Sequence, residues 1–434
     1  MLSILQNILK NTKNMLKILQ NILQLIKFLQ EKIMPIFNIS KVGSIYSGSD
    51  VISKVYAGSD FVYNAVPASD YYLFRDFDPA TGVLSAATGE LEPASRIISI
   101  PNYGLYYGFN RSNITGNVLF PNLKSIGSNG MSYCFSNVST LKGRVSFPKL
   151  TTVDGYGMAG CFTDTGITGE VSFPQLISIG DSGLSSCFER CAGISQVNFP
   201  LLSDIAGYGM RYCFSGCTGI TSISFPKLTN IGSSALYYCF NGCTSITGEV
   251  SFPLLSSIPD SGLSNCFQKC AGISQVNFPL LSDIISKGMR YCFQNCTGIT
   301  SISFPNLTNI GSSALYYCFN GCTGITGEVS FPLLSSIPYS GLSNCFNGCK
   351  GITSISFPKL TSVGEQGMRY CFYGCTNLTG SVSFPLLSTV ESGGLWRCFT
   401  NTKVTQVHFK SSLSGNSECT AKNLGISGTV YFDL

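Results

Sequence analysis

Histidine is almost absent from the sequence, since His408 is the only one among 434 residues. A Ser-His-Asp triad, a Cys-His dyad or a multi-histidine metal site would each have to be built on that residue. His408 lies in a degraded copy of the repeat described below, so we interpret it as an edge residue rather than a catalyst. We therefore expect a non-enzymatic protein without catalytic residues, cofactor or metal.

Charge is also scarce. Charged residues make up 11% of the chain, apolar residues 44%, and the net charge is +5. The apolar share is large enough to bury a core, and the surface must be mainly neutral and polar. There is no run of basic residues of the kind that grips phosphates, which argues against nucleic acid as a partner.

Residues 1–33 are predicted to form an amphipathic helix. Leucine and isoleucine recur there at three- and four-residue spacing, with lysines throughout. Glutamine and asparagine interrupt the apolar run too often for a membrane span, and no small-residue cleavage site follows as in a signal peptide. Such a helix could join copies of the chain into a homo-oligomer. Alternatively, Met34 is the true start, because "QEKIM" can be encoded by a ribosome-binding-site-like stretch followed by a start codon.

Residues 34–66 are predicted to form a β-hairpin attachment segment, and residues 67–95 a linker or small cap. Two apolar-alternating runs each carry a Gly-Ser-Asp turn, which indicates short antiparallel strands. Ile45–Ser49 and Val55–Ser59 resemble a segment of bacteriophage tail and fibre proteins, roughly "KIYxGSxxVxKVYxGSxxVY". The resemblance implies attachment to other virion proteins. An ordinary hairpin with Gly-Ser turns would show the same pattern.

An internal repeat occupies residues 96–434. Phe-Pro recurs at nearly constant steps, and a Cys-Phe pair follows each copy at a fixed distance, as Cys134 follows Phe120. Weaker copies at both ends bring the expected number of turns to about 14, as in a solenoid whose terminal repeats face water. The Phe-Pro pairs begin at Phe120, Phe147, Phe173, Phe199, Phe225, Phe252, Phe278, Phe304, Phe331, Phe357 and Phe384. A longer period of three repeats is also present, because the text from Thr218 onward is nearly duplicated from Thr297.

One repeat predicts a strand followed by a short helix. Ile223 and Phe225 alternate with Ser222 and Ser224, so the apolar pair should face the core. Further on, apolar residues recur at i, i+3, i+4 and i+7, the spacing of one helix face. These are Leu236, Cys239, Phe240 and Cys243. The expected fold is therefore an α/β repeat solenoid with a parallel concave sheet and short convex helices.

The repeat resembles the BspA-like leucine-rich repeat family, whose pattern is roughly "LTSIxIPxxVTSIGxxAFxxC". Ile220–Leu236 and Ser354–Met368 carry the match, and the similarity extends from Ile98 to the C-terminus. The repeat here is longer than the usual one by an extra "YCFNGC"-like turn. The resemblance implies a secreted or surface protein that binds proteins or host surfaces, although the chain shows no signal peptide.

The cysteines of the repeat fall into two columns that share the apolar face, and we interpret them as buried thiols. Disulfides between neighbouring turns and a zinc or redox site are the alternatives. The first column comprises Cys134, Cys161, Cys187, Cys213, Cys239, Cys266, Cys292, Cys318, Cys345, Cys371 and Cys398; the second comprises Cys191, Cys217, Cys243, Cys270, Cys296, Cys322, Cys349 and Cys375. Val138, Thr165 and Thr402 replace the second cysteine in three repeats, which a metal ligand would not tolerate.

Two sets of side chains are candidates for a binding surface. The outward strand positions include Glu170, Gln196, Asn198, Glu249, Gln275, Asn277 and Glu328. The positions before each Cys-Phe are rich in aromatic residues, as recognition surfaces are; they include Tyr212, Tyr237, Tyr238, Tyr291, Tyr316, Tyr317, Tyr370 and Trp396. A solvated sheet and aromatic packing between repeats are the alternative interpretations.

These features favour a recognition or adhesion protein that binds a host-surface protein or glycan. The hairpin segment favours a phage tail or fibre component on the virion surface. A bacterial cell-surface adhesin is the alternative, and a cysteine-based metal or redox protein is a third hypothesis.

Overall fold

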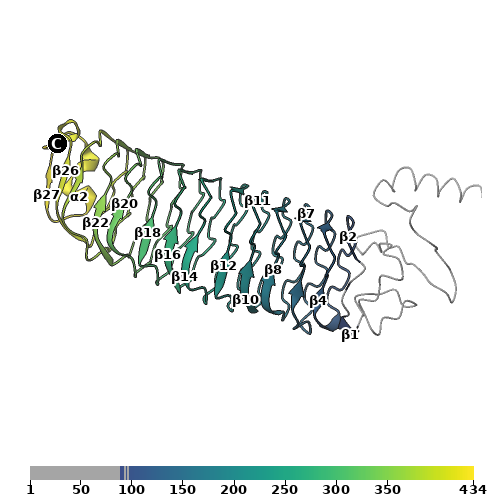
Figure 1. The fold of residues 1–434 in the computed structure, drawn as a ribbon. Coiled ribbons are helices and arrows are strands. Elements are labelled where there is room, and N and C mark those ends of the chain that lie inside the picture. The colour runs from purple at the N-terminus through teal and green to yellow at the C-terminus, as the bar shows by residue number, and fades with distance from the viewer. Residues whose placement is uncertain (1–87, 92–93, 95–96) are drawn as a thin grey trace, which may run out of the picture.

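The computed structural model describes residues 88–91, 94 and 97–434, which form one long stack of parallel turns (Figure 1). The stack has about 13 turns, close to the expected 14. The predicted helix of residues 1–33, the hairpin of 34–66 and nearly all of the 67–95 segment lie outside the described residues. Within the described part of the chain, no helix is long and apolar enough to cross a membrane.

One side of the stack, here called the sheet face, is a ladder of parallel strands. Val197 pairs with Val171 of the preceding turn and with Ile223 of the following turn. Its strands are β1 (Thr88–Leu91), β3 (Asn113–Gly116), β4 (Val118–Leu119), β6 (Val145–Ser146), β8 (Thr168–Ser172), β10 (Gly193–Asn198), β12 (Ser222–Ser224), β14 (Gly248–Ser251), β16 (Ile273–Asn277), β18 (Ser301–Ser303), β20 (Thr326–Ser330), β22 (Gly351–Ser356), β24 (Thr379–Phe384), β26 (Lys403–Phe409) and β27 (Thr429–Tyr431). The predicted parallel sheet is confirmed.

A second ladder of two-residue parallel strands follows the Phe-Pro turn in each repeat. Ile205, for example, pairs with Ile179 and Ile231. The strands are β2 (Ser99–Ile100), β5 (Ser125–Ile126), β7 (Thr152–Val153), β9 (Ser178–Ile179), β11 (Asp204–Ile205), β13 (Asn230–Ile231), β15 (Ser257–Ile258), β17 (Asp283–Ile284), β19 (Asn309–Ile310), β21 (Ser336–Ile337), β23 (Ser362–Val363) and β25 (Thr389–Val390).

The predicted convex helices are wrong. The only helices of the described residues lie at the C-terminal end: η4 (Ser411–Leu413), η5 (Ser417–Cys419) and α2 (Ala421–Leu424). In each repeat the segment expected to be helical is a chain of overlapping β-turns, here called the turn face. In the repeat around Leu236, two buried residues alternate with two half-buried ones. Burial that repeats every four residues also places buried side chains at i, i+3, i+4 and i+7. The apolar spacing therefore fits this chain of turns as well as a helix, which is why a helix was predicted.

Hydrogen bonds explain why the turn face is stable without a helix. Alternate N–H groups donate within the turn to the carbonyl three residues earlier; these belong to Ala235, Tyr237, Cys239, Asn241 and Cys243. The intervening N–H groups donate to carbonyls of the next turn; these belong to Ser234, Leu236, Tyr238, Phe240 and Gly242. Every N–H of the segment therefore has a partner, as a largely buried backbone requires.

The turn face also requires left-handed backbone at every fourth residue. Ser234, Tyr238 and Gly242 have φ of 56°, 56° and 72°. Cys239 donates to the carbonyl of Leu236, so Tyr238 is the third residue of a β-turn, where a type II turn needs positive φ. The same three positions recur with positive φ in the other repeats of the described chain.

Phenylalanine ladders fill the core between the faces. Phe214 stacks on Phe240 with ring centroids 5.4 Å apart, and Phe199 stacks on Phe225 at 5.3 Å. Phe225 is buried and Ser224 is exposed, which confirms the predicted strand faces. Each buried phenylalanine contributes roughly 1.5–3 kcal/mol through its removal from water.

Candidate functional site

All the cysteines are buried and unpaired thiols, as interpreted from the sequence. In the second column the thiol has a hydrogen-bonding role, because Cys243 donates to the carbonyl of Phe214 in the preceding turn at 3.1 Å. Burial raises the pKa of Cys191 to about 11 and that of Cys375 to about 12. Reactive cysteines have lowered pKa values and are accessible, so these thiols have the opposite character. No group of metal-ligating residues is found in the described part of the chain.

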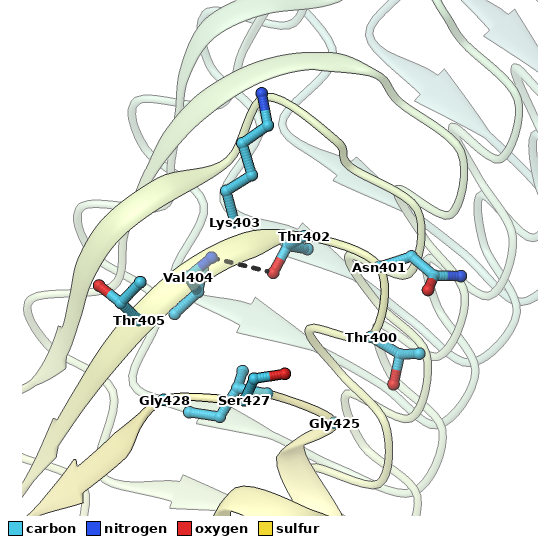
Figure 2. A pocket seen from close by; sticks show the side chains of 10 residues that line it. Thr400, Asn401, Thr402, Lys403, Val404, Thr405, Gly425, Ser427 and Gly428 are labelled. Atoms are coloured by element: carbon cyan, nitrogen blue, oxygen red, sulfur yellow. Dashed lines mark hydrogen bonds between the residues drawn. The ribbon is translucent and has the colours of Figure 1, made fainter.

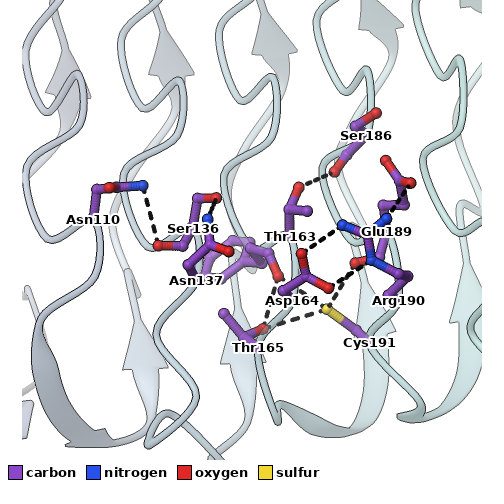
Figure 3. A network of polar contacts seen from close by, with 11 residues as sticks. Asn110, Ser136, Asn137, Thr163, Asp164, Thr165, Ser186, Glu189, Arg190 and Cys191 are labelled. Atoms are coloured by element: carbon purple, nitrogen blue, oxygen red, sulfur yellow. Dashed lines mark hydrogen bonds and ion pairs between the residues drawn. The ribbon is translucent and has the colours of Figure 1, made fainter.

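The structure explains how threonine replaces cysteine in the second column. Thr165 Oγ1 donates to the carbonyl of Phe162 at 2.8 Å, and the thiol of Cys191 from the next turn donates to the same carbonyl at 3.0 Å (Figure 3). Above them an exposed ion pair joins Arg190 to Asp164, with Nε 2.6 Å from Oδ1. The hydrogen bonds of Arg190 lower the pKa of Asp164. Exposed pairs contribute little to stability.

The strand candidates lie on the sheet face with their side chains exposed or half-buried. Glu170 is on β8, Glu249 on β14 and Glu328 on β20, one carboxylate in every third turn. The amide pairs follow on the next strands, Gln196 and Asn198 on β10 and Gln275 and Asn277 on β16. The face is therefore a nearly neutral, hydrogen-bonding sheet, with no site concentrated at one place.

The aromatic candidates gather on the turn face into clusters that also contain arginine. Cluster 1 consists of Tyr208, Arg211, Tyr212, Tyr237 and Tyr238. The guanidinium carbon of Arg211 lies 5.1 Å from the ring centroid of Tyr212 and 5.5 Å from that of Tyr237. Tyr212 and Tyr238 stack at 5.0 Å, and Tyr237 meets Tyr212 edge to face at 5.7 Å.

Cluster 2 repeats this geometry three turns further on. It consists of Arg290, Tyr291, Tyr316 and Tyr317. The guanidinium carbon of Arg290 lies 5.0 Å from the ring of Tyr291 and 5.1 Å from that of Tyr316. Burial raises the pKa of Tyr316, and its neighbour Tyr291 adds to the shift. Cation–π contacts at exposed sites contribute roughly 0.5–1 kcal/mol each.

Cluster 3 is a variant of the same arrangement, and it contains the last two aromatic candidates. It consists of Arg369, Tyr370, Tyr373, Trp396 and Arg397. Arg369 lies over Tyr370 at 5.3 Å, and Arg397 lies over Trp396 at 5.6 Å. The structure thus brings the aromatic candidates together in three groups on one face.

Several of these tyrosines occupy a backbone conformation that does not suit them. Tyr212, Tyr238 and Tyr317 have φ of 54–56°, a region that bulky residues rarely adopt. The same column holds Asn265 and Asn344 in other turns, and asparagine adopts this conformation more easily. Aromatic rings are therefore kept at positions where they cost stability. Backbone strain of this kind is often found at functional sites.

The predicted site residues did not include everything on this face. The sequence shows arginine beside the aromatic residues, as Arg-Tyr-Cys-Phe at Arg211, Arg290 and Arg369, but the four arginines of the clusters were not among the predicted site residues. The predicted site also left out an aromatic group on the first turns, where Tyr107 stacks on Tyr133 at 4.9 Å. Tyr103 and Tyr106 pack edge to face in the same group.

The C-terminal end contains a shallow hollow of about 440 Å³ (Figure 2). Residues 400–405 and 425–428 line it, mostly through small and polar side chains. Nearby, His408 lies 2.9 Å from a carboxylate oxygen of Asp433 and stacks on Tyr431 at 4.7 Å. The two contacts join β26 to the last strand, β27, and to the residues that follow it, so His408 has a structural role at the end of the solenoid.

Comparison with known proteins identifies the repeats. The family model for the BspA type leucine rich repeat region matches residues 100–239, 210–336 and 291–423. The chain belongs to this family. The resemblance predicted from the sequence is confirmed, and the BspA-type repeats extend over most of the chain. No curated protein matches significantly.

Several solved bacterial leucine-rich repeat proteins are similar to these BspA-type repeats in fold. One from Bacteroides ovatus is 18% identical, with a TM-score of 0.48, and the match covers 88% of this chain and all of that one. A leucine-rich cell surface protein from Faecalibacterium prausnitzii is 15% identical, with a TM-score of 0.31 and coverage of 71% and 88%. One from Eubacterium ventriosum is 14% identical, with a TM-score of 0.33 and coverage of 74% and 90%.

Proposed function

We propose that this protein is a non-enzymatic recognition protein that binds a host-surface protein or glycan through the Arg–Tyr clusters of its turn face. The observation that supports this best is the repeated grouping of arginine with partly exposed tyrosine. Tyrosine, tryptophan and arginine are the residues most enriched at binding hot spots. Stacked repeats display them on a rigid, extended surface, the usual basis of binding by solenoid proteins.

A bacterial cell-surface adhesin is the setting that we favour. BspA-type membership supports it, whereas the virion hypothesis depends on the Gly-Ser-Asp segment, which lies outside the described residues. The cysteine-enzyme hypothesis receives no support from thiols that are buried and have raised pKa values.

Binding of fluorescently labelled protein to host cells tests the proposal. In the cluster variant, Arg211→Gln and Arg290→Gln are combined with Tyr237→Ser and Tyr316→Ser, which avoids the left-handed positions. We expect binding to fall at least about tenfold, since removing hot-spot residues typically costs about 1–2 kcal/mol or more each.

The matched control changes four positions of the sheet face: Gln196→Ser, Glu249→Ser, Gln275→Ser and Glu328→Ser. Circular dichroism should show both variants folded, and the control should bind as the unchanged protein does. If the control loses binding and the cluster variant keeps it, the binding surface is the sheet face and the proposal is wrong.

A further inference from the structure

We propose that the ligand of the turn face is an acidic polysaccharide whose carboxylates recur regularly and that lies along the three clusters. This inference rests on the proposed function, because it names the partner of the same surface. The clusters supply arginine guanidinium groups, tyrosine hydroxyls and a fixed spacing between them. Each of these three features constrains the chemistry of the ligand.

The arginines of the clusters have no acidic partner among the described residues. No carboxylate of the described residues lies within ion-pair distance of Arg211, Arg290 or Arg369. Nε of Arg290 is in addition buried without a hydrogen-bond partner among the described residues. Guanidinium groups pair with carboxylates through two parallel hydrogen bonds, so an external carboxylate is the complementary ligand.

A single turn lies between neighbouring clusters. The turn between clusters 1 and 2 carries Ser264 and Asn265, which are 3% and 5% exposed. Ser264 donates to the backbone carbonyl of Arg290 at 3.1 Å. Burial raises the pKa of Tyr238 on one side of this turn, and the positive charge of Arg290 on the other side acts in the opposite direction. Ser343 and Asn344 repeat the arrangement before cluster 3, with Ser343 donating to the carbonyl of Arg369 at 3.2 Å.

The spacing of the clusters favours a polymer with a regular repeat. Arg211, Arg290 and Arg369 are evenly spaced in the sequence, each three turns from the next. Parallel strands lie ~4.8 Å apart, so the clusters recur about every 14 Å. Each turn is about one sugar ring long, and a polysaccharide can place a carboxylate at every cluster. A peptide would need acidic residues at strict intervals over its whole length, whereas a polysaccharide also presents ring hydroxyls to the tyrosines on every unit.

Binding of polygalacturonate, measured by biolayer interferometry, is the direct test. Its fully methyl-esterified form is the matched probe, since it has the same backbone without the charge. We expect the ester to bind at least about tenfold more weakly, because hydrogen bonds to a charged group are stronger than those to a neutral ester. Equal binding of the two polymers would overturn the inference.

Three variants test the role of the arginines. The triple variant Arg211→Gln, Arg290→Gln, Arg369→Gln should bind polygalacturonate about a hundredfold more weakly, since the three contacts act together. The corresponding lysine triple should be intermediate, because it keeps the charge and loses the fork. The control removes three exposed lysines that follow Phe-Pro and lie outside the turn face, Lys149→Gln, Lys227→Gln and Lys359→Gln, and should bind normally. Equal loss in this control would show that net charge alone binds the polymer and would overturn the inference.

The last two tests vary the length of the ligand and its chemical type. Oligogalacturonates long enough to reach two clusters should bind at least about tenfold more tightly than those that reach only one. Poly-glutamate should bind more weakly than polygalacturonate, and equal binding would overturn the choice of a polysaccharide. If polygalacturonate does not bind but the cluster variant still loses cell binding, the inference fails and the proposed function stands. If cell binding does not depend on the clusters, the proposed function fails as well.

Discussion

The sheet face and the turn face both satisfy the backbone hydrogen bonds of stacked turns, but with different backbone conformations. On the sheet face Val197 bonds to the turns before and after it through an ordinary parallel ladder. On the turn face half of the N–H groups bond within their own turn, and every fourth residue is left-handed. Both faces stack with the same spacing. On the turn face, however, each position has its own requirement: positive φ, burial or exposure. Substitutions there should therefore distinguish effects on backbone conformation, on core packing and on binding.

The largest expected effect on stability comes from the turn face at alkaline pH. Every cysteine except Cys419 belongs to a turn-face segment, with its thiol buried in the core behind it. Burial raises the pKa of Cys191 to about 11 and that of Cys270 to about 12, from an ordinary value of 9.0. Above pH 9 the unfolded chain loses these protons while the folded chain keeps them, so unfolding becomes more favourable as pH rises. Each thiol then removes about 1.4 kcal/mol of stability per pH unit until its folded pKa is reached.

The urea midpoint, followed by circular dichroism at pH 8, 9, 10 and 11, measures this effect. We expect a flat response up to about pH 9 and a steep fall above it. Return to pH 8 should restore the midpoint, which separates ionisation from chemical damage. A midpoint that stays constant to pH 11 would contradict the burial of the thiols.

The second prediction compares the cores behind the two faces. Phe240 behind the turn face is 0% exposed and Phe225 behind the sheet face is 3% exposed. Phe240→Ala and Phe225→Ala should each lower the free energy of unfolding by about 3–5 kcal/mol, because each leaves a cavity. Ser224→Ala is the surface control and should change it by less than about 0.5 kcal/mol. Equal effects of Phe225→Ala and Ser224→Ala in thermal unfolding would mean that the strand faces are reversed.

The third prediction separates the two cysteine columns. Cys243→Ser should cost less than about 1 kcal/mol, since a hydroxyl can donate to the carbonyl of Phe214 as the thiol does. Cys239→Ser should cost about 1–3 kcal/mol, because the buried hydroxyl gains no such acceptor. Differential scanning calorimetry of both variants, with Cys239→Ala as the packing control, checks the order. A larger cost for Cys243→Ser would remove the distinction between the columns.

The smallest effect isolates backbone strain. A Cβ added at Gly242 meets nothing within 4 Å, and its φ is 72°. Gly242→Val should therefore cost about 1–2 kcal/mol through conformation alone, and Gly242→Asn considerably less. On the sheet face Ser224→Val should be nearly neutral, because valine suits an extended strand. Urea denaturation of the three variants gives the comparison; equal stability of the two Gly242 variants would show that positive φ is not a condition of the turn face.

The sheet face could be predicted from the sequence because its signal is unambiguous. Ile223 and Phe225 alternate with serines, and alternation has no helical equivalent. The turn face was predicted wrongly because the spacing of Leu236, Cys239, Phe240 and Cys243 is compatible with two structures. One is a helix, and the other is a chain of β-turns in which two buried residues alternate with two half-buried ones. The distinguishing signal was the recurrence of Gly and Asn at four-residue intervals, as at Asn344 and Gly348, because these two residue types adopt positive φ most easily.

The candidate site was predictable as a column of tyrosines and not as a set of clusters. The sequence places Tyr212 and Tyr238 in neighbouring repeats. Their stacking and the position of Arg211 over Tyr212 depend on left-handed backbone at positions where tyrosine itself does not indicate it. The exposed sheet positions were placed correctly because the strand alternation decides them.

The duplicated three-repeat block has a consequence for how this protein can change in evolution. Unequal recombination between the copies beginning at Thr218 and Thr297 would add or remove three whole turns and leave every junction as it is now. The product would fold by the same rules and carry one cluster more or fewer. Relatives of different length would then differ in avidity while recognising the same ligand.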